Sequence, residues 1–302
     1  MNNRTRGTLE MSAAMMISGT IGGFVVLSGQ PVLDVVFWRC VIGAPVLLVV
    51  CAALGMLRGT LTPRLLAFAA LGGVAIVLNW LLLFAAYSRA SIAIATAVYN
   101  TQPFILVGLG ALFFAERLTL TKLMWLGLAF IGMLLIVQAK SSAGYVGNDH
   151  LGGILLALGA AFFYALAAII AKKLDGTPPH LIALIQVCVG SLMLAPFANL
   201  AQLPSDSGTW ATLLTLGVVH TGLVYILLYG AIQKLPTHLT GALSFIYPIV
   251  AILVDYLAFD HRLQPLQLVG IAAILLAAAG MTLGWTLGKK AEAQAPAEHL
   301  SE

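Results

Sequence analysis

Apolar segments of helical length alternate with short polar connectors along nearly the whole chain. A helix with a rise of 1.5 Å per residue needs roughly 20 apolar residues to cross a hydrocarbon core about 30 Å thick. Each segment is continuously apolar rather than alternating, which favours helices over barrel strands. We therefore predict an all-α integral membrane protein with ten transmembrane helices. The predicted spans are residues 8–27, 33–54, 65–86, 92–113, 120–138, 151–171, 180–200, 209–231, 239–259 and 265–287.

A polar segment with a proline interrupts the fourth apolar run, and a similar segment interrupts the ninth. Residues 96–103 are TAVYNTQP and residues 241–248 are GALSFIYP. The two prolines are 145 positions apart (248 − 103), which indicates a tandem duplication. Because each copy holds five spans, an odd number, the second copy is predicted to be inverted in the membrane, as in many transporters. The same offset pairs Gly72 with Gly217, Trp80 with Tyr225, Arg89 with Lys234 and Arg117 with Arg262.

The basic residues predict the orientation, because cytoplasmic loops carry an excess of Lys and Arg. With the N-terminus inside, eleven fall on the cytoplasmic side: Arg4, Arg6, Arg58, Arg64, Arg117, Lys122, Lys172, Lys173, Lys234, Lys289 and Lys290. Only Arg89, Lys140 and Arg262 fall outside. We predict a bacterial inner-membrane protein with both termini in the cytoplasm. Its parts are a first five-helix repeat (1–140), an outer linker (141–150), a second five-helix repeat (151–288) and a disordered cytoplasmic tail (289–302).

Composition agrees with a membrane protein. Of the 302 residues 61% are hydrophobic and 9% are charged, and the mean hydropathy is +1.01. The net charge of +4 arises from residues between the apolar runs, so no nucleic-acid partner is expected. The three cysteines lie within apolar segments, which argues against a disulfide framework or a metal site. We expect an uncleaved first helix and no cofactor.

The two interrupted spans supply the first candidate substrate-binding residues. Thr96, Tyr99 and Asn100 share one helical face with Pro103, and Ser244 and Tyr247 precede Pro248 in the other copy. We predict that these side chains line a cavity between the copies and that Pro103 and Pro248 act as hinges. The alternative is an ordinary proline kink satisfied by packing.

Further candidates are polar or aromatic residues inside other spans, which usually face the interior of a bundle. They are Trp38, Asn79, Trp80, Tyr164, His220 and Tyr225. The alternative for each is a structural hydrogen bond or core packing. Arg39 is the only Lys or Arg away from the ends of a predicted span. Its guanidinium is suited to a substrate carboxylate, but it could instead extend outward toward Asp34 or the lipid headgroups.

No carboxylate falls in the middle of a span, which favours facilitated diffusion over proton antiport. The sequence also lacks the common hydrolase, zinc-protease and P-loop motifs, so we expect no enzyme. Two alternatives stay open: an exporter of cationic drugs with the same fold, and an intramembrane enzyme that uses His220. The glycines Gly280, Gly284 and Gly288 are compatible with a second subunit, although a monomer is favoured.

The segment FFAERLT at residues 113–119, which follows the fourth of ten short spans, resembles the drug/metabolite transporter superfamily, EamA type. The second copy departs from this pattern, because His261 stands where the family more often has Glu. The segment VFWR at residues 36–39 and the TQP at residues 101–103 look most like the YddG-type bacterial exporters of aromatic amino acids. The resemblance implies export of aromatic amino acids and related small metabolites by alternating access through a central cavity.

Overall fold

The computed structural model describes residues 2–57, 61–89, 95, 98–139, 150–199, 203–204, 206–259 and 264–285. All the regular secondary structure in these residues is helical. The α-helices are α1 (Asn3–Gly19), α2 (Ile21–Ser28), α3 (Val32–Ala53), α4 (Pro63–Arg89), α6 (Gln102–Phe114), α7 (Leu120–Ala139), α8 (His150–Lys173), α9 (Pro179–Leu194), α10 (Ser207–Gly217), α11 (Val224–Lys234), α12 (Thr237–Ser244), α13 (Ile246–Phe259) and α14 (Pro265–Leu283). A π-helix, η1 (Val218–Leu223), joins α10 to α11.

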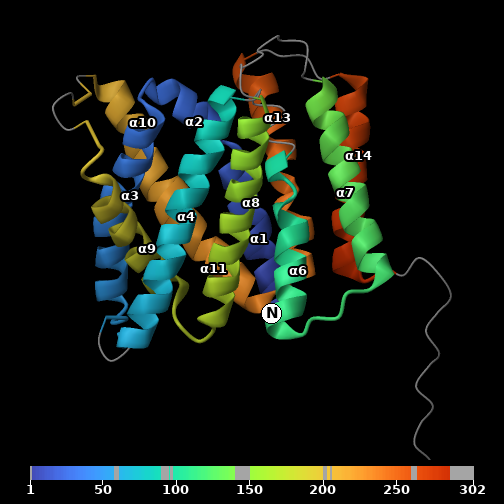
Figure 1. Cartoon of the computed structure of the whole chain (residues 1–302), viewed down its shortest axis with the longest axis horizontal. Helices are drawn as coiled ribbons and strands as arrows, with labels where there is room; N and C mark the ends of the chain where they lie inside the picture. The colour runs from blue at the N-terminus through green and yellow to red at the C-terminus, as the bar shows by residue number, and fades with distance from the viewer. Residues whose placement is uncertain are drawn as a thin grey trace, which may run out of the picture.

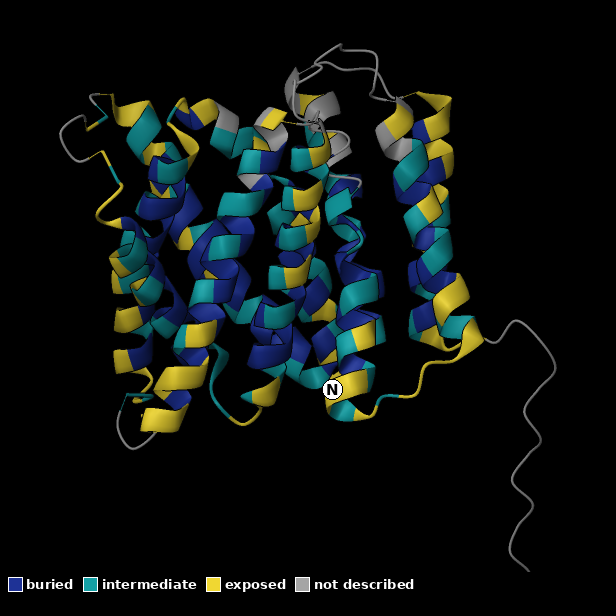
Figure 2. Cartoon of the chain, in the orientation of Figure 1, coloured by how far each residue is buried: buried dark blue, intermediate teal, exposed yellow. Residues whose placement is uncertain are grey.

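The helices stand side by side in one upright bundle (Figure 1). Within the described residues five helical segments are long and apolar enough to cross a membrane: Val32–Ala53, Pro63–Leu83, Leu151–Lys173, Ser207–Lys234 and Pro265–Leu283. Large apolar side chains such as Leu112, Leu192 and Leu257 point outward. Buried residues gather inside the bundle, while exposed residues gather on its outer faces and ends (Figure 2). This distribution suits a bundle surrounded by lipid.

The helix pairs that pack together recur with the offset of 145 residues. α4 packs on α8, and α1 packs on α11; α6 packs on α8, and α1 packs on α13. Under the offset, α4 corresponds to the span α10–η1–α11, α8 to α1–α2, and α6 to α13. α3 packs on its own counterpart α9, and α7 on its counterpart α14. The tertiary contacts therefore repeat in the way that the sequence does.

The two proline segments do not form the kinked single helices that the sequence suggests. Before α6 the helical backbone stops at the turn Asn100–Thr101, and between α12 and α13 it stops at Phe245, which is 145 positions later. Pro103 and Pro248 then lie in the first turn of α6 and α13. Proline is tolerated there because a first-turn residue needs no amide hydrogen for the helix. Each proline thus begins a new helix instead of bending an existing one.

Two other spans are also irregular. The first span, predicted as one helix over 8–27, is divided at Thr20, whose backbone amide and side-chain hydroxyl both donate to the carbonyl of Ile17. The eighth span contains the π-helix η1, a wider turn that is often found at functional sites.

A close glycine contact joins α7 and α14. A Cβ added at Gly280 would lie 2.6 Å from the ring of Trp125, and one added at Gly132 would lie 2.7 Å from the carbonyl oxygen of Gly270. Gly280 therefore faces a helix of the same chain. Gly284 ends α14 with a φ of 72°, and Gly288 lies outside the described residues.

Candidate functional site

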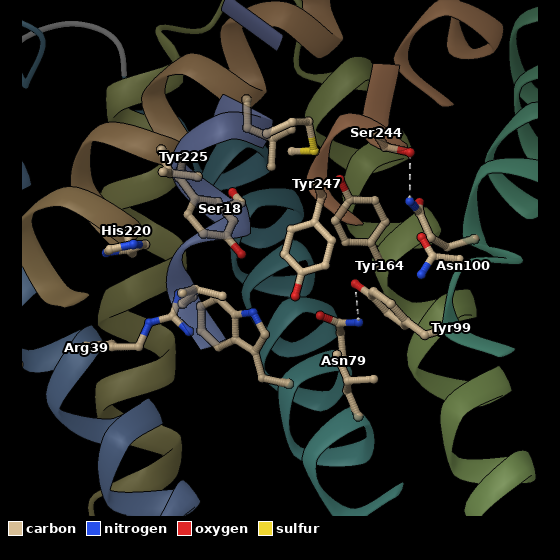
Figure 3. Close-up of a pocket in the computed structure, with 17 residues that line it drawn as sticks. Ser18, Arg39, Asn79, Tyr99, Asn100, Tyr164, His220, Tyr225, Ser244 and Tyr247 are labelled. Atoms are coloured by element: carbon tan, nitrogen blue, oxygen red, sulfur yellow. Dashed lines mark hydrogen bonds between the residues drawn. The ribbon is translucent and has the colours of Figure 1, made fainter. Parts of the chain in front are cut away.

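A cavity of about 130 Å³ lies inside the bundle, between helices from both halves of the chain (Figure 3). Its lining side chains are mostly aromatic or uncharged polar groups. They are Met15, Ser18, Ile21, Arg39, Asn79, Trp80, Leu83, Tyr99, Asn100, Gln102, Tyr164, His220, Val224, Tyr225, Leu228, Ser244 and Tyr247.

Ten of the twelve predicted substrate-binding residues line this one cavity: Arg39, Asn79, Trp80, Tyr99, Asn100, Tyr164, His220, Tyr225, Ser244 and Tyr247. Thr96 lies outside the described residues. Trp38 does not line the cavity. Trp38 precedes Arg39 by one position on α3, so the two side chains point about 100° apart around the helix axis. The ring centroid of Trp38 lies 5.1 Å from that of Trp210. The structure therefore does not bring Trp38 to this cavity with the other predicted residues.

Arg39 points inward rather than toward the headgroups. Its residue surface is only 1% exposed. Asp34, the partner considered for an outward orientation, accepts a hydrogen bond from the backbone amide of Asn199 instead. The guanidinium carbon lies 4.6 Å from the ring centroid of Trp80, a cation–π contact that partly offsets the cost of burying the charge. The outward interpretation of Arg39 is therefore wrong.

The π-helix η1 orients the Arg39 side chain. Nε of Arg39 donates to Oγ1 of Thr221 at 3.1 Å, and that hydroxyl donates to the carbonyl of Leu216, five residues earlier, at 2.8 Å. A regular α-helix would pair that carbonyl with an amide four residues later. The wider π turn therefore holds Thr221 so that its oxygen accepts from Arg39.

Aromatic rings from both copies form the walls of the cavity. Trp80 and Tyr225, which the offset pairs in the sequence, lie edge to face with ring centroids 5.8 Å apart. Tyr99 and Tyr164 make a similar contact at 6.3 Å. All four rings line the cavity, so they present apolar aromatic surface to a guest. In Figure 3 the rings of Tyr225, Tyr247 and Tyr164 lie between Arg39 on one side and Asn100 on the other.

Neutral hydrogen-bonding groups lie on the side of the cavity away from Arg39. Nδ2 of Asn79 donates to the hydroxyl of Tyr99 at 3.3 Å and to the carbonyl of Ala160 at 2.8 Å. Nε2 of Gln102 donates to Oγ of Ser244 at 3.2 Å, and this hydroxyl donates to the carbonyl of Gly241. The contact between Gln102 and Ser244 joins the two interrupted spans beside their breaks.

Sequence reasoning did not select Gln102 or Ser18, although both line the cavity. Gln102 had a usable signal, because the offset of 145 places it opposite Tyr247, which was selected. Ser18 had no such signal, since a serine near the end of a helix is common on any face.

His220 is held against the first span. Its Nε2 lies 2.8 Å from Oγ1 of Thr20, and its ring centroid lies 5.0 Å from that of Phe24. Its Nδ1 lies 3.4 Å from the carbonyl of Thr215, a long contact. The neighbouring hydroxyl is thus a threonine at the break between α1 and α2, and not the serine that a catalytic pair would use.

The EamA-like transporter family model matches the chain twice, over residues 6–138 and 151–283. The two matched segments are offset by 145 residues (151 − 6), the same offset as the internal repeat.

Three relatives have 26–29% identity. An uncharacterized transporter, YxxF of Bacillus subtilis, is 29% identical over 93% of this chain and 89% of its own length. A probable amino-acid metabolite efflux pump of Salmonella typhimurium is 28% identical over 60% of this chain and 64% of its own length. The threonine/homoserine exporter RhtA of Escherichia coli is 26% identical over 64% of this chain and 63% of its own length.

A crystal structure of 20% sequence identity superposes with a TM-score of 0.80, covering 92% of this chain and 97% of the other. At that identity the likeness concerns the fold.

Proposed function

Because the chain belongs to the EamA-like transporter family, we propose that it exports amino acids and related small metabolites, with a preference for aromatic ones, through the cavity described above. It is a multi-pass membrane protein. Two relatives are named as an amino-acid metabolite efflux pump and a threonine/homoserine exporter, which supports an amino-acid-like substrate. The observation behind the aromatic preference is the wall built from Trp80, Tyr99, Tyr164, Tyr225 and Tyr247. Such rings favour a planar apolar side chain over a small hydroxylated one.

The proposed mechanism is alternating access between two inverted copies of five spans each. The double family match and the paired helix contacts support it, because two similar halves of opposite orientation permit two near-equivalent states. The breaks at Asn100–Thr101 and Phe245, beside Pro103 and Pro248, are the hinges in this mechanism. The excess of basic residues in the predicted inner loops supports an inner-membrane location with both termini in the cytoplasm.

Transport by facilitated diffusion fits the chemistry of the cavity. No Asp or Glu is present among the described residues that line it. A proton-coupled mechanism needs a group whose protonation both access states can sense, and a carboxylate is the usual choice. His220 is the remaining titratable candidate, and its bonding to Thr20 favours a structural role.

The described lining residues, which include Arg39 but no Asp or Glu, also argue against an exporter of cationic drugs, because Arg39 would repel a cationic guest. An intramembrane enzyme is the remaining alternative, with His220 in the catalytic role. Substitution of His220 by Ala separates the two, since an enzyme would lose all turnover whereas a transporter would change mainly in affinity.

The decisive experiment is uptake of labelled phenylalanine and threonine into proteoliposomes that contain the purified protein. We expect saturable phenylalanine transport that exceeds threonine transport, and a marked loss in Tyr99→Ala and Asn100→Ala. Trp38→Phe, whose ring packs outside the cavity against Trp210, is the matched control and is expected to transport normally. Normal transport by both cavity variants at all concentrations would overturn the assignment of the site.

A further inference from the structure

Arg39 is a buried cation with no anionic partner among the described residues. Within the described part of the chain the only hydrogen bond of its side chain is the one from Nε to Thr221, and no Asp or Glu pairs with it. The Nη groups donate to no described residue, and the side chain lines the cavity. The contact with the Trp80 ring, 4.6 Å from the guanidinium carbon, stabilises the charge but supplies no anion.

An unpaired guanidinium at this depth is costly, because burial removes its hydration and no described side chain supplies an opposite charge. A guest carboxylate would remove that cost. The two parallel N–H groups of a guanidinium match the two oxygens of a carboxylate, and this bidentate geometry is the strongest common hydrogen-bonded ion pair in proteins.

The opposite side of the cavity offers a hydrogen-bond acceptor but no charge. Oε1 of Gln102 is buried and has no partner among the described residues, and the residue is 5% exposed. The orientation of this amide follows from its neighbour: the Ser244 hydroxyl already donates to Gly241, so it can only accept, and the NH₂ of Gln102 must face it. The free amide oxygen can accept from an N–H or an O–H group equally well.

From these two features we infer that the cavity selects its substrates by their carboxylate and does not require an α-amino group. The substrate class is then aromatic monocarboxylates, which includes 2-hydroxy acids as well as amino acids. The carboxylate binds Arg39, and the amino or hydroxyl group on the neighbouring carbon donates to Gln102. Aromatic amines without a carboxylate are excluded, because no acidic side chain among the described lining residues offsets the charge of Arg39. This inference rests on the proposed function for the aromatic part of the substrate.

The test uses three ligands that share one ring and differ in their polar groups. L-Phenylalanine has both the carboxylate and the amine, 3-phenyllactate keeps the carboxylate without the amine, and phenylalaninol keeps the amine without the carboxylate. Each is titrated into the purified protein in detergent by calorimetry. Each is also used as a competitor of labelled phenylalanine counterflow in proteoliposomes. The variants are Arg39→Gln and Arg39→Lys, with Arg64→Gln, an exposed arginine at the start of α4, as the control.

We expect phenyllactate to bind within about threefold of phenylalanine, and phenylalaninol at least about tenfold more weakly, since charged hydrogen bonds supply the difference. Arg39→Gln should weaken binding of both carboxylates roughly 10- to 100-fold and leave phenylalaninol unchanged or tighter. Arg39→Lys keeps the positive charge but loses the two parallel N–H groups. Its affinity for the carboxylates should lie between those of the wild type and Arg39→Gln. Arg64→Gln should behave as the wild type.

The inference is overturned if phenylalaninol binds the wild-type protein as tightly as phenyllactate does, a comparison that needs no variant to fold. It is also overturned if Arg39→Gln keeps the preference for carboxylates. If phenyllactate binds through Arg39 but phenylalanine is not transported, the inference stands and the proposed function fails. If phenylalanine is transported with no contribution from Arg39, the proposed function stands and the inference fails.

Discussion

Lys234 at the end of α11 and Glu10 on α1 form an ion pair, with 2.6 Å between Nζ and Oε2. Lys234 also donates to the carbonyl of Gly230, and Glu10 also accepts from Arg6. The pair connects the first copy (residues 6–138) to the second (residues 151–283) at the end of the bundle where the N-terminus lies (Figure 1).

A second connection between the two copies lies close by, at Thr237, which is on the other side of Pro236 from Lys234. Oε1 of Glu116 lies 3.2 Å from Nζ of Lys172, and Oε2 accepts from the backbone amide and the hydroxyl of Thr237 at the start of α12. Lys172 also donates to the carbonyl of Leu235. In both connections the first copy supplies the acid and the second supplies the base. We call these two connections together the ionic latch.

The acid and base positions of the ionic latch are not repeated in the other copy. The offset of 145 residues replaces Glu10 with Leu155, Glu116 with His261, Lys172 with Leu27 and Lys234 with Arg89. No acid remains among these four positions. The two copies therefore share their helix packing but differ in charge at these four positions.

We expect loss of the ion pair between Lys234 and Glu10 to open this end of the bundle. A partly buried ion pair contributes about 1–2 kcal/mol, so Lys234→Met should raise accessibility of the cavity from this side by roughly 5- to 30-fold. The measurement is the labelling rate of Ser18→Cys, a cavity position, by an impermeant maleimide in inside-out vesicles. The protein carries Cys188→Ser, which removes the exposed native thiol.

The control for this experiment is the exchanged pair Glu10→Lys with Lys234→Glu. It keeps the attraction with its direction reversed and should restore slow labelling. Unchanged labelling in Lys234→Met would show that the ion pair does not close this end.

The contribution of Glu116 to stability should depend on pH only in acid. Partial burial would raise the pKa of this carboxyl, but contacts from His238 and Thr237 and the charge of Lys172 outweigh burial and hold the pKa at about 2. Since the ordinary pKa is 4.5, the unfolded chain binds more protons between these two values. The stabilisation is therefore complete above pH 4.5 and is lost as the pH falls toward 2.

The corresponding measurement is thermal unfolding in detergent of the wild type and Glu116→Gln at several pH values. At pH 7 the variant should be less stable by about 1–2 kcal/mol, a value reduced for water at the bundle end, where the side chain is 17% exposed. The difference should fall by about half at pH 3. A difference that grew as the pH fell would contradict the proposed charge on Glu116.

Replacement of Gln102 by Leu should separate binding from stability. The change removes a buried acceptor that has no partner among the described residues, which costs about 1–3 kcal/mol, and one hydrogen bond to Ser244, which contributes about 1 kcal/mol. We expect the melting temperature to stay the same or rise while the KM for phenylalanine increases. Ser244→Ala, which removes the partner and keeps the acceptor, should instead lower the melting temperature. A lower KM in Gln102→Leu would show that the free oxygen does not contact substrate.

Replacement of Gly280 by Ala should weaken the packing of α14 on α7. The new methyl would lie 2.6 Å from Trp125, and overpacking of this kind costs about 1–3 kcal/mol. Gly127→Ala on α7 is the matched control, since a Cβ there has no neighbour within 4 Å and alanine favours a helix. Thermal unfolding of the two variants should therefore shift in opposite directions. Equal shifts of the melting temperature in the two variants would contradict the prediction, because they would indicate that α7 and α14 separate easily to accommodate the methyl group.

The sequence by itself determined the helical class, the duplication and most of the cavity lining. Spans are readable because a backbone in lipid must satisfy its hydrogen bonds within a helix, which requires continuous apolar runs. Duplication is readable because both copies kept proline at the same position, at Pro103 and Pro248. Polar and aromatic residues inside spans, such as Asn79 and Tyr225, pointed to the cavity because lipid disfavours them.

Only the tertiary structure decided the direction of individual side chains and the conformation of the interrupted spans. Trp38 and Arg39 are adjacent in sequence, yet one packs on Trp210 and the other lines the cavity, because the outcome depends on which helix faces each side of α3. The π-helix around Thr221 and the pairing of Gln102 with Ser244 join residues far apart in the chain. Their geometry arises from packing between helices, which no local pattern of polar and apolar residues encodes.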